Sequence, residues 1–229
     1  MQSDTINLFD SIATKYDLIN DLLSFGIHRF WLKKAVAKVP LKDYYSILDL
    51  ATGTGNFAFE FLKANPKINV IGIDLSENML NIARKKSKKL QLEARFILGS
   101  ATEIPFPDDT FDIVSISYGI RNVNDVDKCL LEIHRVLKKD GNFVIVEFGK
   151  PQGWFRSIYN AYQRIFVQNF GGLLSKNFYA YNYLVQTSNS FPSGNDFVNK
   201  INQTNLFTFV RFYSLTFGIA YIYTGKAKK

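Results

Sequence analysis

The sequence has a single cysteine, Cys129, and only two histidines, His28 and His134, in 229 residues. One thiol cannot form a disulfide within the chain, and a zinc site needs several thiolate or imidazole ligands. We therefore expect neither a disulfide-stabilised domain nor a bound metal. Residues 1–10 are polar and include two acidic residues, so they lack the apolar segment of a secretory signal. These absences favour a cytoplasmic protein.

Acidic residues are scarce toward the C-terminal end of the chain. Residues 148–229 carry nine Lys and Arg but one acidic residue, Asp196, whereas residues 1–147 carry 19 of each sign. This stretch therefore holds the whole net charge of +8, and it contains 20 of the 35 aromatic residues. Such a segment can bind nucleic acid through phosphate contacts and base stacking, or lie among the headgroups of an anionic membrane. A packed core in a chain of biased composition explains it equally well.

The stretch Leu206 to Tyr223 is nearly all apolar, and about 20 such residues can cross a bilayer. Arg211 interrupts the run, however, and β-branched and aromatic residues dominate it. These features predict two strands that divide near Tyr213 and Ser214. We therefore expect a β-hairpin at this end of the chain rather than a membrane helix.

Short apolar stretches alternate with helical patterns from residue 45 onward. Strands are predicted over residues 46–50, 69–74, 94–98, 111–117 and 142–148. Helices are predicted over residues 57–64, 76–90 and 125–137, the second capped by Ser76. With the terminal hairpin, this order predicts an α/β fold: a doubly wound, mostly parallel seven-stranded sheet with helices on both faces. The basic run over residues 84–89 is interpreted as a solvated helix end.

Residues suited to ligand binding follow three of these strands. Ligands of a doubly wound sheet bind beyond the carboxyl ends of its strands. Asp49-Leu-Ala-Thr-Gly53-Thr54-Gly55 follows the first strand, and its glycines allow a tight turn and a close backbone approach to a ligand. Asp74 ends the second strand, where its carboxylate can accept hydrogen bonds from both hydroxyls of a ribose. Ser100 and Ala101 follow the third strand, where an adenine edge would lie.

The Gly-rich loop alone does not identify the ligand. Gly53-x-Gly55-x-x-Ala58 also fits the looser fingerprint of NAD-binding proteins. In a dinucleotide-binding fold the chain normally begins at or near the first strand and includes a second mononucleotide-binding half. Here about 45 residues precede the first strand. Asp49 also suits a ligand with a cationic amino-acid end better than a pyrophosphate. These features favour S-adenosylmethionine over NAD.

Several further segments resemble one family of methyltransferases. They are Phe9-Asp10-Ser-Ile-Ala13-x-x-Tyr16-Asp17, Asn20-Asp-Leu-Leu-Ser24-Phe-Gly26-Ile-His28-Arg29-x-Trp31, Asp74-Leu-Ser76-Glu-Asn-Met79-Leu80, Pro105-Phe-Pro107-Asp108, Tyr118-Gly119-Ile-Arg121-Asn122-Val123, Glu147-Phe148-x-Lys150-Pro151, and Tyr181-x-Tyr183-Leu184 followed by Phe191-Pro192. They cover nearly the whole chain, and the Gly-Ile-Arg-Asn-Val block is the most selective of them. On these motifs the chain resembles the ubiquinone/menaquinone biosynthesis C-methyltransferase family of class I S-adenosylmethionine-dependent enzymes, of the demethylmenaquinone methyltransferase type.

The resemblance implies a reaction and a set of cofactor contacts. The reaction would be methyl transfer to a ring carbon of a polyprenyl quinol, either demethylmenaquinol or the corresponding ubiquinone precursor. The implied cofactor-contacting residues are Thr54, Asp74, Ser100, Ala101 and Ser117, beside the Asp49, Gly53 and Gly55 of the loop. Ser100 stands where the family usually has Asp or Asn, which leaves the backbone N–H of Ala101 as the expected contact to adenine.

Arg121 and Asn122 are the candidate catalytic residues. They come just after the fourth strand, and a cation or hydrogen-bond donor there would stabilise a phenolate of the substrate. Arg121 could instead pair with an acidic neighbour as scaffolding. Tyr118 is expected to line the pocket, His28 with Arg29 either to cover the site or to cap a helix, and His134 to be structural.

One methyltransferase domain is expected to fill residues 1–229. It would have a helical N-terminal segment over residues 1–44, with helices at 4–16 and 28–39, and a cofactor-binding core over residues 45–150. An aromatic, basic segment over residues 151–229 would have helices up to about residue 191 and from residue 194. This last segment would hold the protein at the inner face of an anionic membrane, where a lipid-tailed substrate resides. A homo-oligomer is left open.

Four other functions remain as alternatives. A methyltransferase of another small molecule would lack the aromatic, basic bias of the C-terminal segment. A nucleic-acid methyltransferase fits the charge, but Ser-Ile-Ser-Tyr at 115–118 replaces the Asp/Asn-Pro-Pro-Tyr loop of base-flipping enzymes, so no nucleic-acid partner is expected. An NAD-dependent oxidoreductase and a non-catalytic binding protein are the remaining two.

Overall fold

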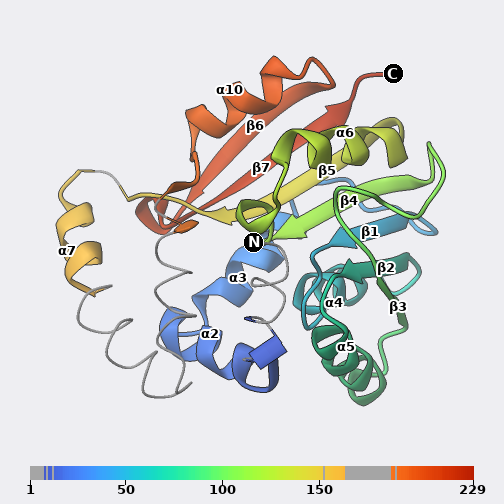
Figure 1. Cartoon of the computed structure of the whole chain (residues 1–229), viewed down its shortest axis with the longest axis horizontal. Helices are drawn as coiled ribbons and strands as arrows, with labels where there is room; N and C mark the ends of the chain where they lie inside the picture. The colour runs from blue at the N-terminus through green and yellow to red at the C-terminus, as the bar shows by residue number, and fades with distance from the viewer. Residues whose placement is uncertain (1–7, 9, 12, 152, 163–186, 189) are drawn as a thin grey trace.

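A seven-stranded sheet in the order β3-β2-β1-β4-β5-β7-β6 forms the centre of the protein (Figure 1). The computed structural model describes residues 8, 10–11, 13–151, 153–162, 187–188 and 190–229. The strands are β1 Ser46–Leu50, β2 Asn69–Asp74, β3 Ala94–Leu98, β4 Phe111–Ser117, β5 Leu137–Phe148, β6 Phe207–Leu215 and β7 Ala220–Ala227. The strands β1 to β5 pair in parallel, and β7 is antiparallel to both β5 and β6. The predicted fold class is confirmed.

The terminal hairpin divides later in the chain than predicted. Tyr213 and Ser214 lie within β6, where they pair with Ile222 and Tyr221 of β7. The connection is the short 3₁₀ turn η4, Thr216–Gly218. Its Gly218 has a φ of 88°, a left-handed conformation that glycine adopts without strain. The expected division near residues 213 and 214 is therefore wrong. The turn is placed at Gly218 and not at the midpoint of the apolar run.

The helices confirm the predicted pattern in the core of the chain and extend it elsewhere. They are η1 Ala13–Lys15, α2 Tyr16–Ser24, α3 Ile27–Val36, α4 Asn56–Ala64, α5 Glu77–Leu90, η2 Ile120–Asn122, α6 Val126–Val136, α7 Phe155–Tyr162 and α10 Asn195–Gln203. Ser76 caps α5 as predicted, since its Oγ accepts a hydrogen bond from Met79 N at 3.1 Å. The sequence did not predict α2. Residues 4–7, 9 and 12 of the helix expected over 4–16 lie outside the described residues, and so do residues 163–186 of the expected aromatic helices.

Helices cover both faces of the sheet (Figure 1), and an apolar layer lies between each set of helices and the strands. One face is covered by α3, α4 and α5, whose Trp31, Phe57 and Leu80 belong to one buried cluster. The other face is covered by α6 and α10, which contribute Leu130 and Phe197 to a second cluster. Both faces of the sheet are thus covered by helices. A ligand can therefore reach the sheet only where the strands end, at its carboxyl edge.

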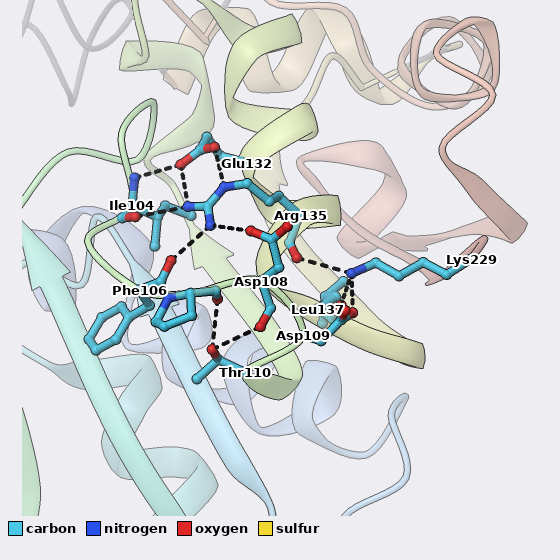
Figure 2. A network of polar contacts seen from close by, with 10 residues as sticks. Ile104, Phe106, Asp108, Asp109, Thr110, Glu132, Arg135, Leu137 and Lys229 are labelled. Carbon is cyan, nitrogen blue, oxygen red and sulfur yellow. Dashed lines mark hydrogen bonds and ion pairs between the residues drawn. The ribbon is translucent and has the colours of Figure 1, made fainter.

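Arg135 on α6 anchors the long loop that joins β3 to β4 (Figure 2). Its guanidinium donates hydrogen bonds to Ile104 O at 2.9 Å and to Phe106 O at 2.8 Å, and it pairs with Asp108 at 2.8 Å. Glu132 on the same helix holds the guanidinium from behind at 2.7 Å. Because Ser100 to Thr102 open this loop, the Arg135 network fixes the chain that follows β3.

The basic run at the end of α5 differs in part from its interpretation as a solvated helix end. Lys85, Lys88 and Lys89 are exposed, as that interpretation expects. Arg84 instead donates to Phe96 O at 3.0 Å, and Lys86 points inward to Asp17 of α2 at 2.9 Å. Among the described residues, no helix is both long and apolar enough to cross a membrane.

Candidate active site

The loop after β1 turns sharply into α4, as its glycines predict. Ala51, Gly53 and Gly55 have φ values of 48°, 55° and 82°. A Cβ atom on Gly55 would lie 2.8 Å from a ring carbon of Phe59, so packing as well as the backbone angle requires glycine there. Gly53 has open space at its Cβ position. The loop therefore presents bare backbone at the carboxyl edge of the sheet.

Asp74 at the end of β2 joins this loop to the start of α5. Its Oδ2 accepts a hydrogen bond from Gly53 N at 2.8 Å, and its Oδ1 accepts one from Ser76 N at 2.9 Å. Burial raises the pKa of Asp74, and the backbone hydrogen bonds oppose this rise. The carboxylate is thus fixed in position between two loops that follow neighbouring strands.

A pocket opens at this edge of the sheet. Its empty space, including the open mouth, is about 860 Å³. The lining includes six of the predicted site residues: Gly53, Asp74, Ser100, Ala101, Ser117 and Asn122. Tyr118 also lines the pocket, as predicted. Residues that follow β1, β2, β3 and β4 are therefore brought together as the sheet topology requires.

Three predicted cofactor residues do not line this pocket. Asp49 is fully buried beneath it and accepts hydrogen bonds from Thr52 Oγ1 at 2.6 Å and Ser115 Oγ at 2.7 Å. Burial raises the pKa of Asp49 to about 6, although both hydroxyls lower it. The hydroxyl of Thr54 donates to Asp17 at 2.6 Å, and Gly55 packs against Phe59. These three residues shape the loop instead. Asp49, buried beneath the pocket, can act on a bound ligand through its charge but not through direct contact.

Arg121 has a buried acidic partner. Its Nη1 lies 2.5 Å from Oε1 of Glu147 on β5, and the two side chains are 4% and 0% exposed. Burial raises the pKa of Glu147, and the charge of Arg121 opposes this rise. Nη1 also donates to Tyr118 O at 2.7 Å. The alternative that Arg121 pairs with an acidic neighbour therefore finds that neighbour in Glu147. The guanidinium does not line the pocket, whose wall here is formed by Tyr118 and Asn122.

Two buried polar atoms on that wall have no hydrogen-bond partner among the described residues. They are the hydroxyl of Tyr118 and Oδ1 of Asn122. The Tyr118 ring stacks on Phe148 with centroids 4.7 Å apart, and burial raises the pKa of this phenol well above its usual value. Buried polar groups are nearly always satisfied, so these two atoms, and Arg121 Nε beside them, leave hydrogen-bonding capacity unused among the described residues.

Several lining residues were not predicted from the sequence. Tyr16 reaches the pocket from α2, and Met79 and Leu75 reach it from the start of α5, next to Asp74. Tyr16 and Met79 both stand in motifs of the resemblance, which was the one available signal. Periodicity could not identify them because their position depends on how α2 and α5 pack.

His28 and Arg29 lie away from this pocket. His28 lies in the first turn of α3, with Nδ1 2.6 Å from Ser24 Oγ, and burial lowers its pKa. Arg29 pairs with Asp21 at 2.5 Å. Neither residue lines the pocket, and both instead join α2 to α3. His134, expected to be structural, lies 3.0 Å from Lys228 O and packs on Phe207.

The residues at the pocket fit S-adenosylmethionine. A carboxylate can accept about four hydrogen bonds, so Asp74 keeps capacity for ribose hydroxyls beyond its backbone donors. Leu75, Met79 and Ala101 give the pocket an apolar lining that is suited to an adenine ring. Asp49 would place negative charge below the cationic amino-acid end.

Comparison with known proteins agrees with this fit. The sequence model of the ubiE/COQ5 methyltransferase family matches residues 2–227. The demethylmenaquinone methyltransferase of Thermus thermophilus is 41% identical over 219 residues, which are 95% of this chain and 99% of that protein. The ubiquinone/menaquinone biosynthesis C-methyltransferase UbiE of Rickettsia rickettsii is 39% identical over 225 residues, 95% of this chain and 90% of that protein.

A solved structure supports the fold alone. The crystal structure of a SAM-dependent methyltransferase of Thermotoga maritima, described as a possible histamine N-methyltransferase, has a TM-score of 0.68. It is 19% identical and covers 97% of this chain and 99% of its own. Family, fold and pocket lead to one conclusion: the chain belongs to the ubiE/COQ5 methyltransferase family and is an enzyme that uses S-adenosylmethionine as its methyl donor.

Proposed function

We propose that this enzyme methylates a ring carbon of a polyprenyl quinol, either demethylmenaquinol or the corresponding ubiquinone precursor. The observation that carries the proposal is the near full-length similarity to relatives named for these two reactions. Their identity of about 40% extends over both ends of the chain, and not only over the cofactor loop shared by many methyltransferases. An intact cofactor pocket argues against a non-catalytic protein, and the family against an NAD-dependent oxidoreductase.

The chemistry requires the protein to position the quinol and to stabilise a phenolate. When bound, S-adenosylmethionine supplies an electrophilic methyl group. The ring carbon becomes electron-rich when a neighbouring phenol, with a pKa near ~10, loses its proton. In our proposal this hydroxyl lies between Oδ1 of Asn122, which can accept its hydrogen bond and orient it, and the Tyr118 hydroxyl; both atoms lack a partner among the described residues. Because burial keeps the pKa of Tyr118 high, its hydroxyl stays protonated and can donate to the phenolate.

Arg121 would act with Asn122 in this step. The guanidinium and the Asn122 amide share one acceptor, Tyr118 O, at 2.7 Å and 3.5 Å. Arg121 therefore holds the backbone that carries both substrate contacts, and its charge favours a phenolate nearby. We retain Arg121 and Asn122 as the proposed catalytic pair, with Asn122 as the contact to the substrate and Arg121 as its support.

Quinone profiling tests the proposed substrate. A strain that lacks this gene should accumulate a quinone lighter by one methyl group, and the wild-type gene should restore the methylated form. An Asp74→Ala gene serves as the matched control with a weakened cofactor site. An unchanged quinone profile with a loss of another methylated metabolite would favour the alternative of a different small-molecule substrate.

We further propose that the aromatic, basic segment of residues 151–229 places the enzyme on an anionic membrane surface. This segment would follow a helical N-terminal segment (residues 1–44) and a cofactor-binding core (residues 45–150) within a single domain. Trp154 and Phe217 support the proposal, since they are 73% and 67% exposed and their ring centroids lie 6.3 Å apart. Arg156 of the same segment is exposed, and so is Lys150, which directly precedes the segment. Aromatic rings at headgroup level with cations worth about 1 kcal/mol each are the usual elements of such a surface.

Sedimentation with vesicles tests the membrane proposal. The protein should pellet with anionic but not with neutral vesicles, and high salt should release it because exposed charges are screened over about 8–10 Å. Trp154→Ala with Phe217→Ala should weaken binding, whereas Tyr44→Ala, at a position equally exposed outside this segment, should not. Equal pelleting with both kinds of vesicle would contradict the proposal. So would a lack of vesicle binding together with binding of the protein to DNA in a gel-shift assay.

A further inference from the structure

Four polar side chains form a cluster where α2 meets the cofactor loop. We call Asp17, Thr54, Asn56 and Lys86 the Asp17 cluster. Asp17 accepts hydrogen bonds from Thr54 Oγ1 at 2.6 Å, from Asn56 Nδ2 at 2.9 Å and from Lys86 Nζ at 2.9 Å. Lys86 also donates to Asn56 Oδ1 at 2.5 Å and to Thr54 Oγ1 at 3.2 Å. The cluster therefore joins α2, the start of α4 and α5.

The ion pair at its centre is partly buried. The side chains of Lys86 and Asp17 are 24% and 28% exposed. Burial acts to raise the pKa of Asp17, but the charge of Lys86 and the hydrogen bonds of the cluster outweigh it and lower the pKa. Burial lowers the pKa of Lys86, and Asp17 opposes that change. Each charge thus depends on the other, and removal of one leaves its partner in an unfavourable place.

Two members of the cluster directly follow residues that line the cofactor pocket. Asp17 follows Tyr16, which lines the pocket from α2, and Thr54 follows Gly53, which lines it from the loop. Other polar residues of α2, such as Asp21 and Ser24, bond to α3 instead. The Asp17 cluster is thus a polar link between α2 and the cofactor loop.

We propose that the pair of Asp17 and Lys86 is a positioning device for the cofactor. It holds Tyr16 against the Gly53 loop, so that the pocket wall is already in place when S-adenosylmethionine binds. Lys86 touches neither cofactor nor substrate and acts through Asp17 and Thr54. The apparent affinity falls in proportion to the fraction of molecules whose site is competent. If that fraction drops to about a tenth without the ion pair, the dissociation constant rises about tenfold.

Calorimetry with S-adenosylmethionine and S-adenosylhomocysteine tests the proposal on the full chain. Lys86→Met and Asp17→Asn should each raise the dissociation constant about tenfold. The double variant should bind about as weakly as either single variant, because both remove the same link. Lys86→Arg keeps the charge and should recover most of the affinity. Lys88→Met removes an exposed lysine of the same helix and should bind as the wild type does.

Two further readouts separate positioning from general stability. The KM for S-adenosylmethionine should rise in Lys86→Met far more than the KM for the quinol, and hydrogen exchange of the α2 amides should accelerate. A lowered melting temperature with an unchanged dissociation constant in the folded protein would overturn the proposal. So would additive effects of the two single variants. Because binding is measured without quinol, a wrong substrate assignment would leave these results intact.

Discussion

The pair of Arg121 and Glu147 allows a stability prediction with a definite magnitude. Both side chains are buried, and Glu147 also accepts a hydrogen bond from Phe148 N at 2.8 Å. Arg121→Met removes the positive charge at similar volume and leaves the carboxylate without its ion partner. The loss of one partner of a buried pair costs about 3–5 kcal/mol. For a chain of this size, about 2–4 °C per kcal/mol gives a melting temperature lower by roughly 6–20 °C.

The same variant should also gain a characteristic pH dependence. Without Arg121, its charge no longer opposes the burial that raises the pKa of Glu147. The folded state then holds this proton above the pH at which the unfolded state releases it. The variant therefore keeps the stabilising contribution of protonated Glu147 below the ordinary pKa of Glu, about 4.3. It loses this contribution as the pH rises through the pKa of Glu147 in the folded state. Urea unfolding at about pH 5, 6.5 and 8 should show a penalty that increases with pH.

A double variant separates charge from packing. Arg121→Met with Glu147→Gln leaves no charge at this pair and should recover more than half of the lost free energy of unfolding. A single variant Arg121→Met within about 1 kcal/mol of the wild type at every pH would refute the reasoning. So would a double variant that is less stable than the single one.

Asp74→Ala should weaken S-adenosylmethionine binding by about 1.5–3 kcal/mol in calorimetry, the usual contribution of hydrogen bonds to a charged group; wild-type affinity would remove Asp74 from the site. Tyr118→Phe removes the hydroxyl that would donate to the phenolate and should lower kcat by about 10²–10³, with cofactor affinity unchanged. The pKa of Asp49, raised to about 6, predicts that the free energy of unfolding falls by roughly 2 kcal/mol as the pH rises from about 4 to 6; Asp49→Asn should remove this share, and an unchanged slope would contradict it. Arg135→Ala should destabilise the fold by about 1–3 kcal/mol, since it leaves Ile104 O and Phe106 O without their donor; Lys139→Ala, an exposed position nearby in sequence, is its control.

The sequence predicted the sheet because the signals for parallel strands are local. Short apolar runs that alternate with helical patterns and turns predict β1 to β4, and Ser76 identifies the start of α5 within one residue. The site followed from topology, since residues after neighbouring strands meet at one edge. This is why Asp74, Ser100 and Ser117 line the pocket as expected.

The contacts that sequence could not predict join distant segments. Arg121 and Glu147 are 26 positions apart, and Lys86 and Asp17 are 69 positions apart. A lysine within a basic run resembles any solvated lysine until the packing of α2 against α5 turns it inward. Likewise, nothing local distinguishes Thr54, whose hydroxyl bonds to Asp17, from a threonine that contacts the cofactor. Partner choice at long range is a property of packing, which single-sequence patterns do not record.

The central claim is that this chain transfers the methyl group of S-adenosylmethionine to a quinol ring. The most direct measurement incubates the purified enzyme with S-adenosylmethionine labelled in its methyl group and with demethylmenaquinol in anionic vesicles, followed by mass spectrometry of the lipid. We expect a labelled quinol heavier by one methyl group on a ring carbon, and loss of this product in Asn122→Ala. A parallel reaction with the ubiquinone precursor decides between the two quinols. An enzyme that binds S-adenosylmethionine and yet labels neither quinol would contradict the claim.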